Sequence, residues 1–401
     1  MPAREVPVAP SRALRIALVA GEASGDQIGA ALIGAVRRAL PDAQFFGVGG
    51  PRMQAAGFVP WAASDELAVM GLTEVVRHLP RLLRLRRQLR RRLLEMRPDA
   101  FVGIDAPEFN LGLAAQLKAQ GIRTVQYVSP QVWAWRRGRV RSIGRSCDLV
   151  LCLLPFETQF YRDHGVRAQF VGHPLADQIP LEVDRDAARR ALDVQGAGPL
   201  VALLPGSRLG EVTRLGRDFA GAAHWLHARH PEVRFIAPMA SAAVRAVFAA
   251  ACDAAAPGTT IRLLDGHAQA ALAAADVALV ASGTATLEAL LSKRPMVVAY
   301  RLGNFTAFLL RRLGIVKVQY FSQPNLLAGH ALVPEFFQQA VTPAALGAAL
   351  EAQLRDPAHA AQLAHEFRRI HEQLRRGGAQ LAAAAIIALA RPPAAAAAYG
   401  A

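Results

Sequence analysis

The sequence has few cysteines, almost no lysine and no long apolar run. Its three cysteines, Cys147, Cys152 and Cys252, match neither a disulfide framework nor a Cys-x-x-Cys metal spacing. We interpret them as buried thiols in a reducing compartment. No stretch reaches the roughly 20 apolar residues that span a bilayer, and the first apolar run, residues 16–20, is too short for a secretion signal. We therefore expect a globular protein without a signal peptide or a transmembrane helix.

The charge is unbalanced, and arginine supplies nearly all of the excess. Lys and Arg number 46 against 31 Asp and Glu, which gives a formal net charge of +15. Lysine occurs only at Lys118, Lys293 and Lys317. Such an excess suggests an anionic partner: nucleic acid, a phosphorylated substrate or an acidic membrane surface. A biased genomic base composition would also favour Arg and Ala, so the charge does not choose among these partners.

Short apolar runs alternate with longer helical patterns along the chain, which is typical of doubly wound α/β folds with parallel sheets. The first series of expected strands lies at residues 15–20, 44–48, 100–104, 124–128 and 149–154. The second series lies at residues 200–204, 234–238, 261–264, 277–281 and 296–300. We therefore expect two Rossmann-like domains that face a cleft, with ligands bound beyond the carboxyl ends of the strands.

The domain boundaries follow from composition. We expect an N-terminal domain over residues 13–175 and a second domain over residues 176–342. The pattern of residues 343–390 is helical. Residues 391–401 form a Pro- and Ala-rich tail that we expect to be disordered, as we do the N-terminus at residues 1–12.

The turn after the first expected strand reads Gly21-Glu22-Ala23-Ser24-Gly25-Asp26. It is neither a dinucleotide fingerprint nor a P-loop. In one interpretation Ser24 caps the following helix, with Gln27 as its capping-box partner. In the other, the free backbone N–H groups and Ser24 bind a polar or anionic part of a ligand. The residues alone leave both interpretations open.

A carboxylate, Asp105, stands at the end of the expected strand at residues 100–104. It could be the cap of the next helix, with Pro107 in the first turn and Glu108 closing a capping box. It could equally face the cleft and act as a general base toward a hydroxyl.

The second domain contains two turns of the kind that binds nucleotides. Pro205-Gly206-Ser207-Arg208 follows one strand and offers N–H donors, a helix N-terminus and a guanidinium to a phosphate. Ser282-Gly283-Thr284 follows another strand, and Glu288 lies just beyond, where it could accept hydrogen bonds from ribose hydroxyls. A solvated Arg208 and a first-turn charge at Glu288 are the ordinary alternatives. Two such turns in one domain favour a nucleotide.

Residues 77–97 are rich in Arg and Leu. With Pro80 in the first turn, the pattern predicts a helix with Leu82, Leu83, Leu89 and Leu93 on one face and Arg84, Arg87 and Arg91 opposite. Such a helix could simply pack on its own domain. It could also lie on an anionic membrane, together with the apolar residues just before it, Val69, Met70 and Leu72.

Seven motifs occur in an order that resembles the bacterial lipid A disaccharide synthase family, over residues 16–389. They read Ala20-Gly21-Glu22-Ala23-Ser24-Gly25-Asp26, Ala68-Val69-Met70-Gly71, Val102-Gly103-Ile104-Asp105-Ala106-Pro107, Tyr127-Val128-Ser129-Pro130-Gln131-Val132-Trp133-Ala134-Trp135, Leu204-Pro205-Gly206-Ser207-Arg208, Ala281-Ser282-Gly283-Thr284-Ala285-Thr286-Leu287-Glu288 and Gln323-Pro324-Asn325-Leu326-Leu327-Ala328-Gly329.

The resemblance implies an inverting glycosyltransferase with a two-domain fold of the GT-B type. It implies transfer of 2,3-diacylglucosamine from UDP-2,3-diacylglucosamine onto the primary hydroxyl of 2,3-diacylglucosamine 1-phosphate, which is lipid X. The products are lipid A disaccharide 1-phosphate, an intermediate of lipopolysaccharide biosynthesis, and UDP.

The resemblance also implies roles for single residues. Asp105 matches the general base, and Glu288 matches the ribose role. The remaining residues of the implied UDP site are Gly206, Ser207, Arg208, Gly283, Thr284 and Asn325. The residues implied on the acceptor side are Glu22, Ser24, Gly25 and Asp26.

No metal or other cofactor is implied, and the sequence has no His, Cys and carboxylate set with metal-ligand spacing. The implied location is the cytoplasm, on the inner face of the bacterial inner membrane. Family members form homodimers through their C-terminal segments, which for this chain are residues 343–389.

Two other functions remain as alternatives. A second UDP-sugar enzyme on the same scaffold, such as an epimerase, would use Arg208, Glu288 and Asn325 but would have no use for an apolar acceptor surface at residues 69–93. A basic nucleic-acid-binding protein would explain the charge. The chain lacks an aromatic-basic RNA motif and zinc-finger spacing, so we expect no nucleic-acid partner.

Overall fold

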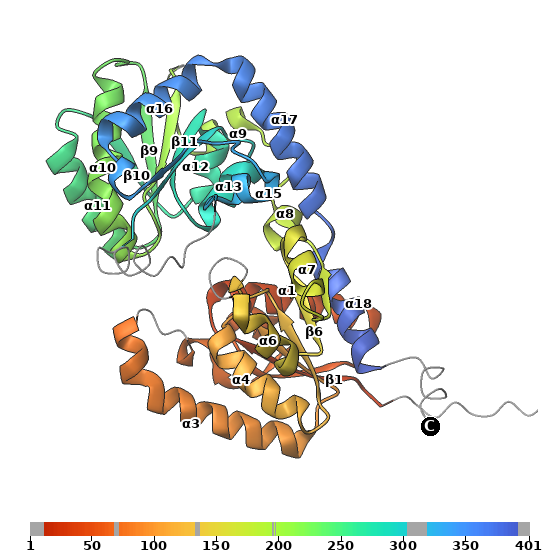
Figure 1. Ribbon diagram of the computed structural model, residues 1–401. Helices are drawn as coiled ribbons and strands as arrows, with labels where there is room; N and C mark the ends of the chain where they lie inside the picture. Colours follow the sequence, from red (N-terminus) through yellow and green to blue (C-terminus); the bar gives the residue numbers. More distant parts are fainter. Residues whose placement is uncertain are drawn as a thin grey trace, which may run out of the picture. The chain divides into compact units, whose positions relative to one another are not determined.

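The computed structural model describes residues 12–67, 72–132, 137–194, 196, 198–302 and 319–391, with the backbone alone for residues 65, 72–79 and 137. The chain forms two compact units. The first comprises the described residues up to Pro174 together with those from Arg376 onward, and the second comprises Leu175–Arg375. Each unit contains one parallel sheet with helices on both of its faces (Figure 1).

The first unit is built on a sheet of seven parallel strands in the order β3-β2-β1-β4-β5-β6-β7. The strands are β1 (Arg15–Ala20), β2 (Gln44–Gly49), β3 (Val59–Ala63), β4 (Ala100–Ile104), β5 (Arg123–Tyr127), β6 (Leu149–Cys152) and β7 (Ala168–Phe170). The helices are α1 (Ala23–Ala39), α2 (Pro51–Ala55), α3 (Leu72–Met96), α4 (Pro107–Lys118), α6 (Val140–Ser146), α7 (Pro155–Arg162) and α18 (Gly378–Ala390).

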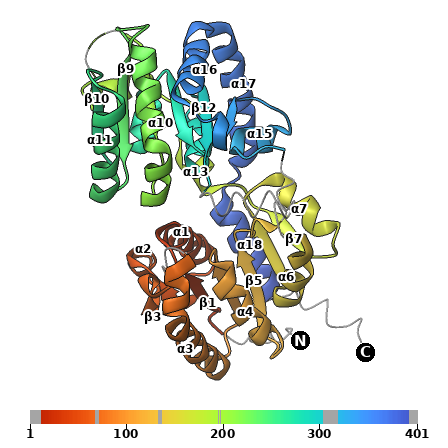
Figure 2. The ribbon, with the colours of Figure 1, turned by 60° about the vertical axis from the view of Figure 1, so that its left-hand side comes forward.

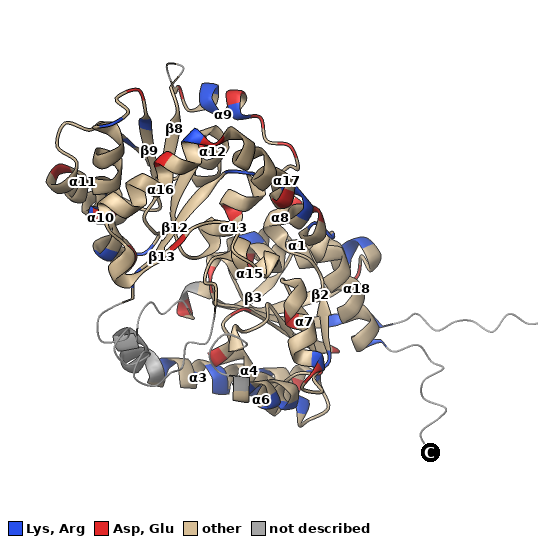
Figure 3. Ribbon diagram, turned by 45° about the horizontal axis from the view of Figure 1, so that its top comes forward, with Lys and Arg blue, Asp and Glu red and all other residues tan. Residues whose placement is uncertain are grey.

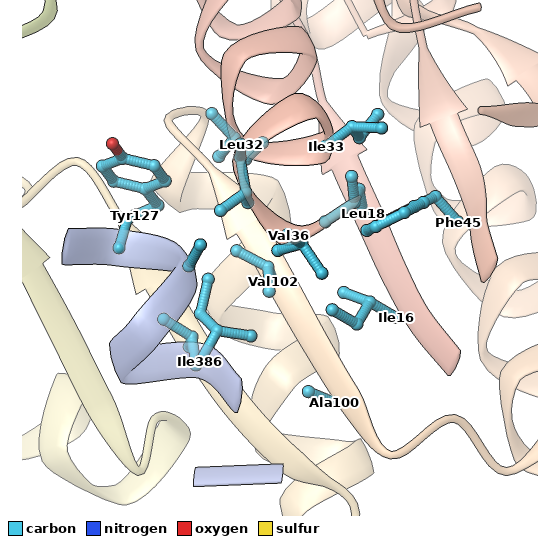
Figure 4. Packing of buried hydrophobic residues seen from close by; sticks show 14 of the residues in the cluster. Ile16, Leu18, Leu32, Ile33, Val36, Phe45, Ala100, Val102, Tyr127 and Ile386 are labelled. Carbon is cyan, nitrogen blue, oxygen red and sulfur yellow. The ribbon is translucent and has the colours of Figure 1, made fainter. Parts of the chain in front are cut away.

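Both faces of this sheet are buried, which explains why its central strands are continuous apolar runs rather than alternating ones. On β1, Ile16 and Leu18 belong to the core under α1 and α18, whereas Ala17 and Val19 belong to the core under α3 and α4. Figure 4 shows the first of these cores, where Ile386 of α18 lies beside the strands. Helix α18, the last helix of the described residues, therefore completes the core of the first unit.

The second unit is built on six parallel strands in the order β10-β9-β8-β11-β12-β13. The strands are β8 (Leu200–Leu204), β9 (Arg234–Met239), β10 (Ile261–Asp265), β11 (Val277–Ala281), β12 (Met296–Tyr300) and β13 (Glu335–Phe337). The helices are α8 (Pro174–Gln178), α9 (Arg185–Ala191), α10 (Leu209–His227), α11 (Ala242–Ala255), α12 (Ala268–Ala274), α13 (Thr284–Leu291), α15 (Gln323–Ala328), α16 (Pro343–Arg355) and α17 (Pro357–Leu374). Figure 2 shows α10 and α11 side by side against this sheet.

The α/β fold class with two doubly wound sheets and C-terminal helices is confirmed. All ten expected strands are present, but the prediction omitted β3, β7 and β13. Each of these three lies at an edge of its sheet and has no fully buried residue. Short edge strands lack the apolar run by which buried parallel strands are recognised.

The helical pattern over residues 343–390 does not form one structural segment. Helices α16 and α17 belong to the second unit, whereas α18 belongs to the first. The reason is composition: Ala382, Ala383 and Ile386 give α18 an apolar face that fits the core beside α1. The chain thus passes between the units twice, after Pro174 and after Arg375.

Candidate functional site

In each sheet there is one point at which the order of the strands reverses direction. In the second unit the chain runs from β8 outward to β10 and then returns to β11, on the other side of β8. The turns after β8 and β11 therefore lead in opposite directions and leave a crevice at their carboxyl ends, where ligands of doubly wound folds bind. In the first unit the same position lies between β1 and β4. Gly21–Asp26 and Asp105 follow those two strands, as the sequence predicts.

A pocket of ≈ 340 Å³ opens at the β8 and β11 position of the second unit. Six of the seven residues predicted to bind UDP line this pocket: Gly206, Ser207, Arg208, Gly283, Thr284 and Glu288. Its other walls come from β9 and the N-terminus of α12. Turns that lie about 75 residues apart in the sequence thus meet at one concave site, because β8 and β11 are neighbours.

The turn after β8 presents backbone N–H groups and a guanidinium together. The N–H groups of Ser207 and Arg208 donate to Glu211 Oε2 at 3.0 and 3.3 Å, and Arg208 Nη1 donates to Glu211 Oε1 at 3.3 Å. Gly206 has φ +129°, and a Cβ there would lie 2.5 Å from the Cβ of Glu211, so only glycine fits. The Arg208 side chain is 67% exposed and lies at the N-terminus of α10, whose dipole favours an anion.

Glu288 brings a second carboxylate to the pocket. It is the fifth residue of α13, so the alternative of a first-turn charge does not hold. Burial raises the pKa of Glu288 above its ordinary value. Gly283 precedes the helix with φ +147°, which brings the backbone at Thr284 to the pocket wall. A partly buried carboxylate beside exposed backbone groups suits hydrogen bonds with the hydroxyls of a sugar.

Asn325 does not line the pocket. Its amide nitrogen donates to the carbonyl of Val333 and to Glu335 Oε1, both at 2.9 Å. Its amide oxygen accepts from the N–H groups of Leu332 and Val333 at 2.8 and 2.9 Å. Because these four bonds use all of its donors and lone pairs, the side chain has no atom left for a nucleotide. The expectation of direct contact is corrected: Asn325 fixes the segment between α15 and β13.

In the first unit, Asp105 occupies a strained turn and does not cap α4. The cap position belongs to Ala106, and no side chain bonds there. Asp105 and Ala106 have φ +52° and +40°, a conformation that costs on the order of 1–3 kcal/mol per non-glycine residue. Burial raises the pKa of Asp105, the charge of Glu22 raises it further, and a hydrogen bond from the Ala106 backbone lowers it. A desolvated carboxyl group on a strained turn is typical of a functional residue.

The turn after β1 has an exposed part and a buried part. Helix α1 begins at Ala23, with Glu22 at its cap position, so Ser24 is not the cap that one interpretation expected. Glu22 and Ser24 are exposed, and Gly25 is buried against Ala20. The turn lies next to that of Asp105, because a Cβ on Gly21 would lie 3.3 Å from the Cβ of Ala106.

Asp26, expected on the acceptor side, is instead buried beneath the neighbouring helix. Its carboxylate accepts the N–H groups of Gly50, Arg52 and Met53 at 2.9 to 3.0 Å and so holds the N-terminus of α2. Both of its oxygens are occupied by these bonds, so the structure gives Asp26 a supporting role.

The Arg- and Leu-rich segment forms a longer helix than expected. Helix α3 begins at Leu72, so Pro80 lies inside it and not in its first turn. The residues that reach the core of the first unit are Leu85, Leu89 and Leu93, while Leu82 and Leu83 are only partly buried; Leu85 was missing from the predicted face.

The outer face of α3 carries the exposed arginines Arg84, Arg87 and Arg91, and Figure 3 marks its basic positions in blue. Val69 and Met70 lie outside the described residues, and the side chain of Leu72 does too.

No helix in the described ranges is long and apolar enough to cross a bilayer. Nor do three His, Cys, Asp or Glu side chains of these ranges gather as a metal-ligand group.

Two residues near Asp105 escaped the sequence analysis: Asn110 and Gln126. Both are buried amides whose nitrogens donate to the backbone carbonyl of Asp105, at 2.9 and 3.0 Å. The sequence carries no clear signal for them, because the strand of Gln126 reads Arg-Thr-Val-Gln-Tyr and already contains other polar residues.

Comparisons with known proteins concern the family and the fold of the chain. The family model described as lipid-A-disaccharide synthetase matches residues 16–388. The lipid-A-disaccharide synthase of Alkalilimnicola ehrlichii is 55% identical over 379 residues, which cover 94% of this chain and 99% of the relative. The corresponding protein of Azotobacter vinelandii is 53% identical over 94% of this chain and 98% of its own length.

Solved structures with a similar fold include the kitacinnamycin glycotransferase, with a TM-score of 0.61 and 21% identity over 94% of this chain and 99% of that chain. The UDP-GlcNAc 2-epimerase of Neisseria meningitidis, bound to UDP-GlcNAc, has a TM-score of 0.59 and 10% identity over 90% and 99%. These likenesses concern the fold, which is of the GT-B glycosyltransferase type. The full-length match to the family model and the relatives above 50% identity decide the family: the chain belongs to the lipid-A-disaccharide synthase family.

Proposed function

We propose that this chain condenses UDP-2,3-diacylglucosamine with lipid X to give lipid A disaccharide 1-phosphate and UDP. Family membership supports a hexosyltransferase that forms the lipid A disaccharide. The single observation that carries the assignment of the site is the pocket between β8 and β11, which gathers six residues chosen from sequence as UDP ligands. An epimerase-like enzyme would have the same fold, but the curated relatives favour transfer.

On the donor side, the Arg208 guanidinium, the Ser207 side chain and the N-terminus of α10 hold the diphosphate, while the N–H groups of Ser207 and Arg208 donate to Glu211. Negative charge grows on the diphosphate as the bond to the anomeric carbon breaks, and the guanidinium and the helix N-terminus stabilise that charge. Glu288 accepts hydrogen bonds from the ribose hydroxyls, while Gly283 and Thr284 form the adjoining wall. These groups belong to the chain itself, so the proposal needs no metal or cofactor.

On the acceptor side, Asp105 removes the proton of the primary hydroxyl of lipid X. The hydroxyl oxygen then attacks the anomeric carbon in line with the departing UDP, which inverts the configuration. A general base of this kind contributes a factor of about 10²–10⁴ to the rate. The raised pKa of Asp105 suits the role, because a base accepts a proton more readily when its pKa is higher. Glu22, Ser24 and Gly25 form the rest of the proposed acceptor site.

The test of the reaction uses both substrates. Purified protein incubated with UDP-2,3-diacylglucosamine and lipid X should release UDP and form a disaccharide, whereas omission of either substrate should prevent both. Conversion of the UDP-sugar to an epimer without lipid X would support the epimerase alternative and contradict transfer.

We further propose that the enzyme works as a homodimer at the cytoplasmic face of the inner membrane. The exposed arginines of α3 support the membrane part, since cationic residues near an anionic surface contribute about 1 kcal/mol each. Residues 343–389, which contribute helices to both units, are the residues proposed to serve assembly. Analytical ultracentrifugation of the full chain tests the dimer, and a monomer at micromolar concentration would contradict it.

A further inference from the structure

The backbone carbonyl of Asp105 is held by two side-chain amides from different elements. Asn110 Nδ2, in α4, donates to it at 2.9 Å, and Gln126 Nε2, in β5, donates to it at 3.0 Å. Each amide also reaches a second strand end: Asn110 bonds the carbonyl of Val19 and Gln126 that of Val128, both at 3.3 Å. Two side chains therefore connect the carboxyl ends of β1, β4 and β5.

This arrangement is built into the packing around Gly103. Gly103 pairs with Gln126 in the register of β4 and β5, and a Cβ on Gly103 would lie 2.7 Å from the Cβ of Asn110. The missing side chain at Gly103 thus gives Asn110 the space from which it reaches the Asp105 carbonyl.

The backbone near the two amides is strained in two places, after β4 and after β5. Asp105, Ala106 and Val128 all have positive φ, at +52°, +40° and +76°. Residues persist in this region only when the surrounding structure over-determines them, and such residues cluster at active sites. The amides of Asn110 and Gln126 supply that constraint at Asp105.

The two amides hold this carbonyl although their own side-chain oxygens are left without hydrogen bonds in the described residues. Within the described part of the chain, Asn110 Oδ1 and Gln126 Oε1 are buried and have no hydrogen-bond partner. Each unpaired buried acceptor opposes folding, so the two amides hold the Asp105 carbonyl at a cost in stability.

We propose that Asn110 and Gln126 are positioning residues that fix the direction of the Asp105 carboxylate toward the acceptor hydroxyl. The inference rests on the proposed function, in which Asp105 is the base. Displacement of a reacting group by about 1 Å costs on the order of 10²-fold in rate, so loss of one amide should lower kcat while leaving the UDP pocket of the second unit intact.

The experiment is a double-mutant cycle. Gln126→Met and Asn110→Ala are each made in the wild type and in Asp105→Asn, and kcat, the affinity for UDP and the melting temperature are measured. We expect each single variant to lose about 10- to 100-fold in kcat, to keep its affinity for UDP, and to cause no further loss in the Asp105→Asn background.

Thr124→Val is the matched control. Thr124 is buried on the same face of β5, two residues before Gln126, and its hydroxyl bonds Ser146 and Asp148 and not Asp105. This change should lower the melting temperature and leave kcat within about twofold.

The outcomes separate the inference from the function on which it rests. If Asp105→Asn keeps activity within tenfold of the wild type, the proposed base fails, and the inference fails with it. If Asp105→Asn is nearly inactive but the amide variants reduce its residual activity by the same factor as in the wild type, only the inference is overturned. If one amide variant does not fold, the other takes its place, because both donate to the same carbonyl.

Discussion

At the scale of single residues, the proposed function assigns the chemistry of the first unit to Asp105. We predict that Asp105→Asn, which keeps the shape and removes the base, lowers turnover by about 10²–10⁴. Affinity for UDP should not change, because the pocket belongs to the other unit. Steady-state rates of UDP release together with calorimetric binding of UDP check both parts. Activity within tenfold of the wild type would show that Asp105 is not the base.

The pKa of Asp105 gives a second prediction. The base acts only when ionised, so kcat/KM should fall as the pH decreases through its raised pKa. Burial is the main cause of the raised value, and the charge of Glu22 is the next. Glu22→Gln removes that neighbouring charge and should move the acid limb of the kcat/KM profile to lower pH. An unmoved limb would show that Glu22 does not act on the titrating group.

Arg208 gives the corresponding prediction in the second unit. Arg208→Ala should weaken UDP binding by about tenfold or more, since hydrogen bonds to charged groups contribute about 1.5–3 kcal/mol. Binding of uridine, which has no phosphates, should stay the same and serves as the control. Equal losses for UDP and uridine, or no loss at all, would remove Arg208 from the diphosphate site.

The position of a site was predictable from sequence where a strand, a glycine turn and a helix follow one another along the chain. That pattern marked the turns at Gly206–Arg208 and Gly283–Glu288, and residues of both turns line one pocket. Asp26 and Asn325 were misjudged because their partners, at residues 50–53 and 332–335, lie outside the helices that contain them, and no pattern in the sequence shows such contacts. Asn110 and Gln126 were missed for the same reason.

At the scale of elements, buried strands and long helices were predictable, whereas three of the four edge strands and the start of α3 were not. The apolar runs of the inner strands follow from burial on both faces of the sheet. Helix α3 begins eight residues before Pro80, although proline usually stands in the first turn of a helix. Sequence pattern also could not show that α18 leaves its neighbours α16 and α17 to join the first unit.

The role of α18 can be measured. Ile386 is fully buried in the core of the first unit, so Ile386→Ala should lower the free energy of unfolding of that unit by about 2–5 kcal/mol. Ile387→Ala is the control, since Ile387 lies next in the same helix and is only partly buried. Urea unfolding curves compare the two. Equal effects would mean that α18 does not pack on the first unit through the Ile386 face.

At the scale of the whole molecule, the net charge of +15 is explained by the places where the arginines lie. The pocket uses one of the arginines, Arg208, and α3 exposes several more. A helix with its leucines in the core and its arginines exposed folds on its own domain and still presents a cationic surface. The charge therefore fits a protein with an anionic bilayer nearby, and the residues do not require nucleic acid to explain it.

We predict that changing Arg84, Arg87 and Arg91 together to Gln weakens binding to vesicles of anionic phospholipid, and that added salt weakens binding of the wild type. Vesicles of zwitterionic lipid are the lipid control. Arg190, Arg375 and Arg376 are exposed arginines outside α3, and their triple change to Gln is the control of equal charge. Equal weakening by both triple variants would leave net charge alone as the cause.

The return of α18 to the first unit reverses the order in which the two units can be finished during synthesis. Domains generally fold as they leave the ribosome, the N-terminal one first. Here the first unit lacks helix α18 of its core until residues 378–390 have been made, whereas the described residues of the second unit end at Arg375. The half of the enzyme that carries Asp105 is therefore translated first and completed last.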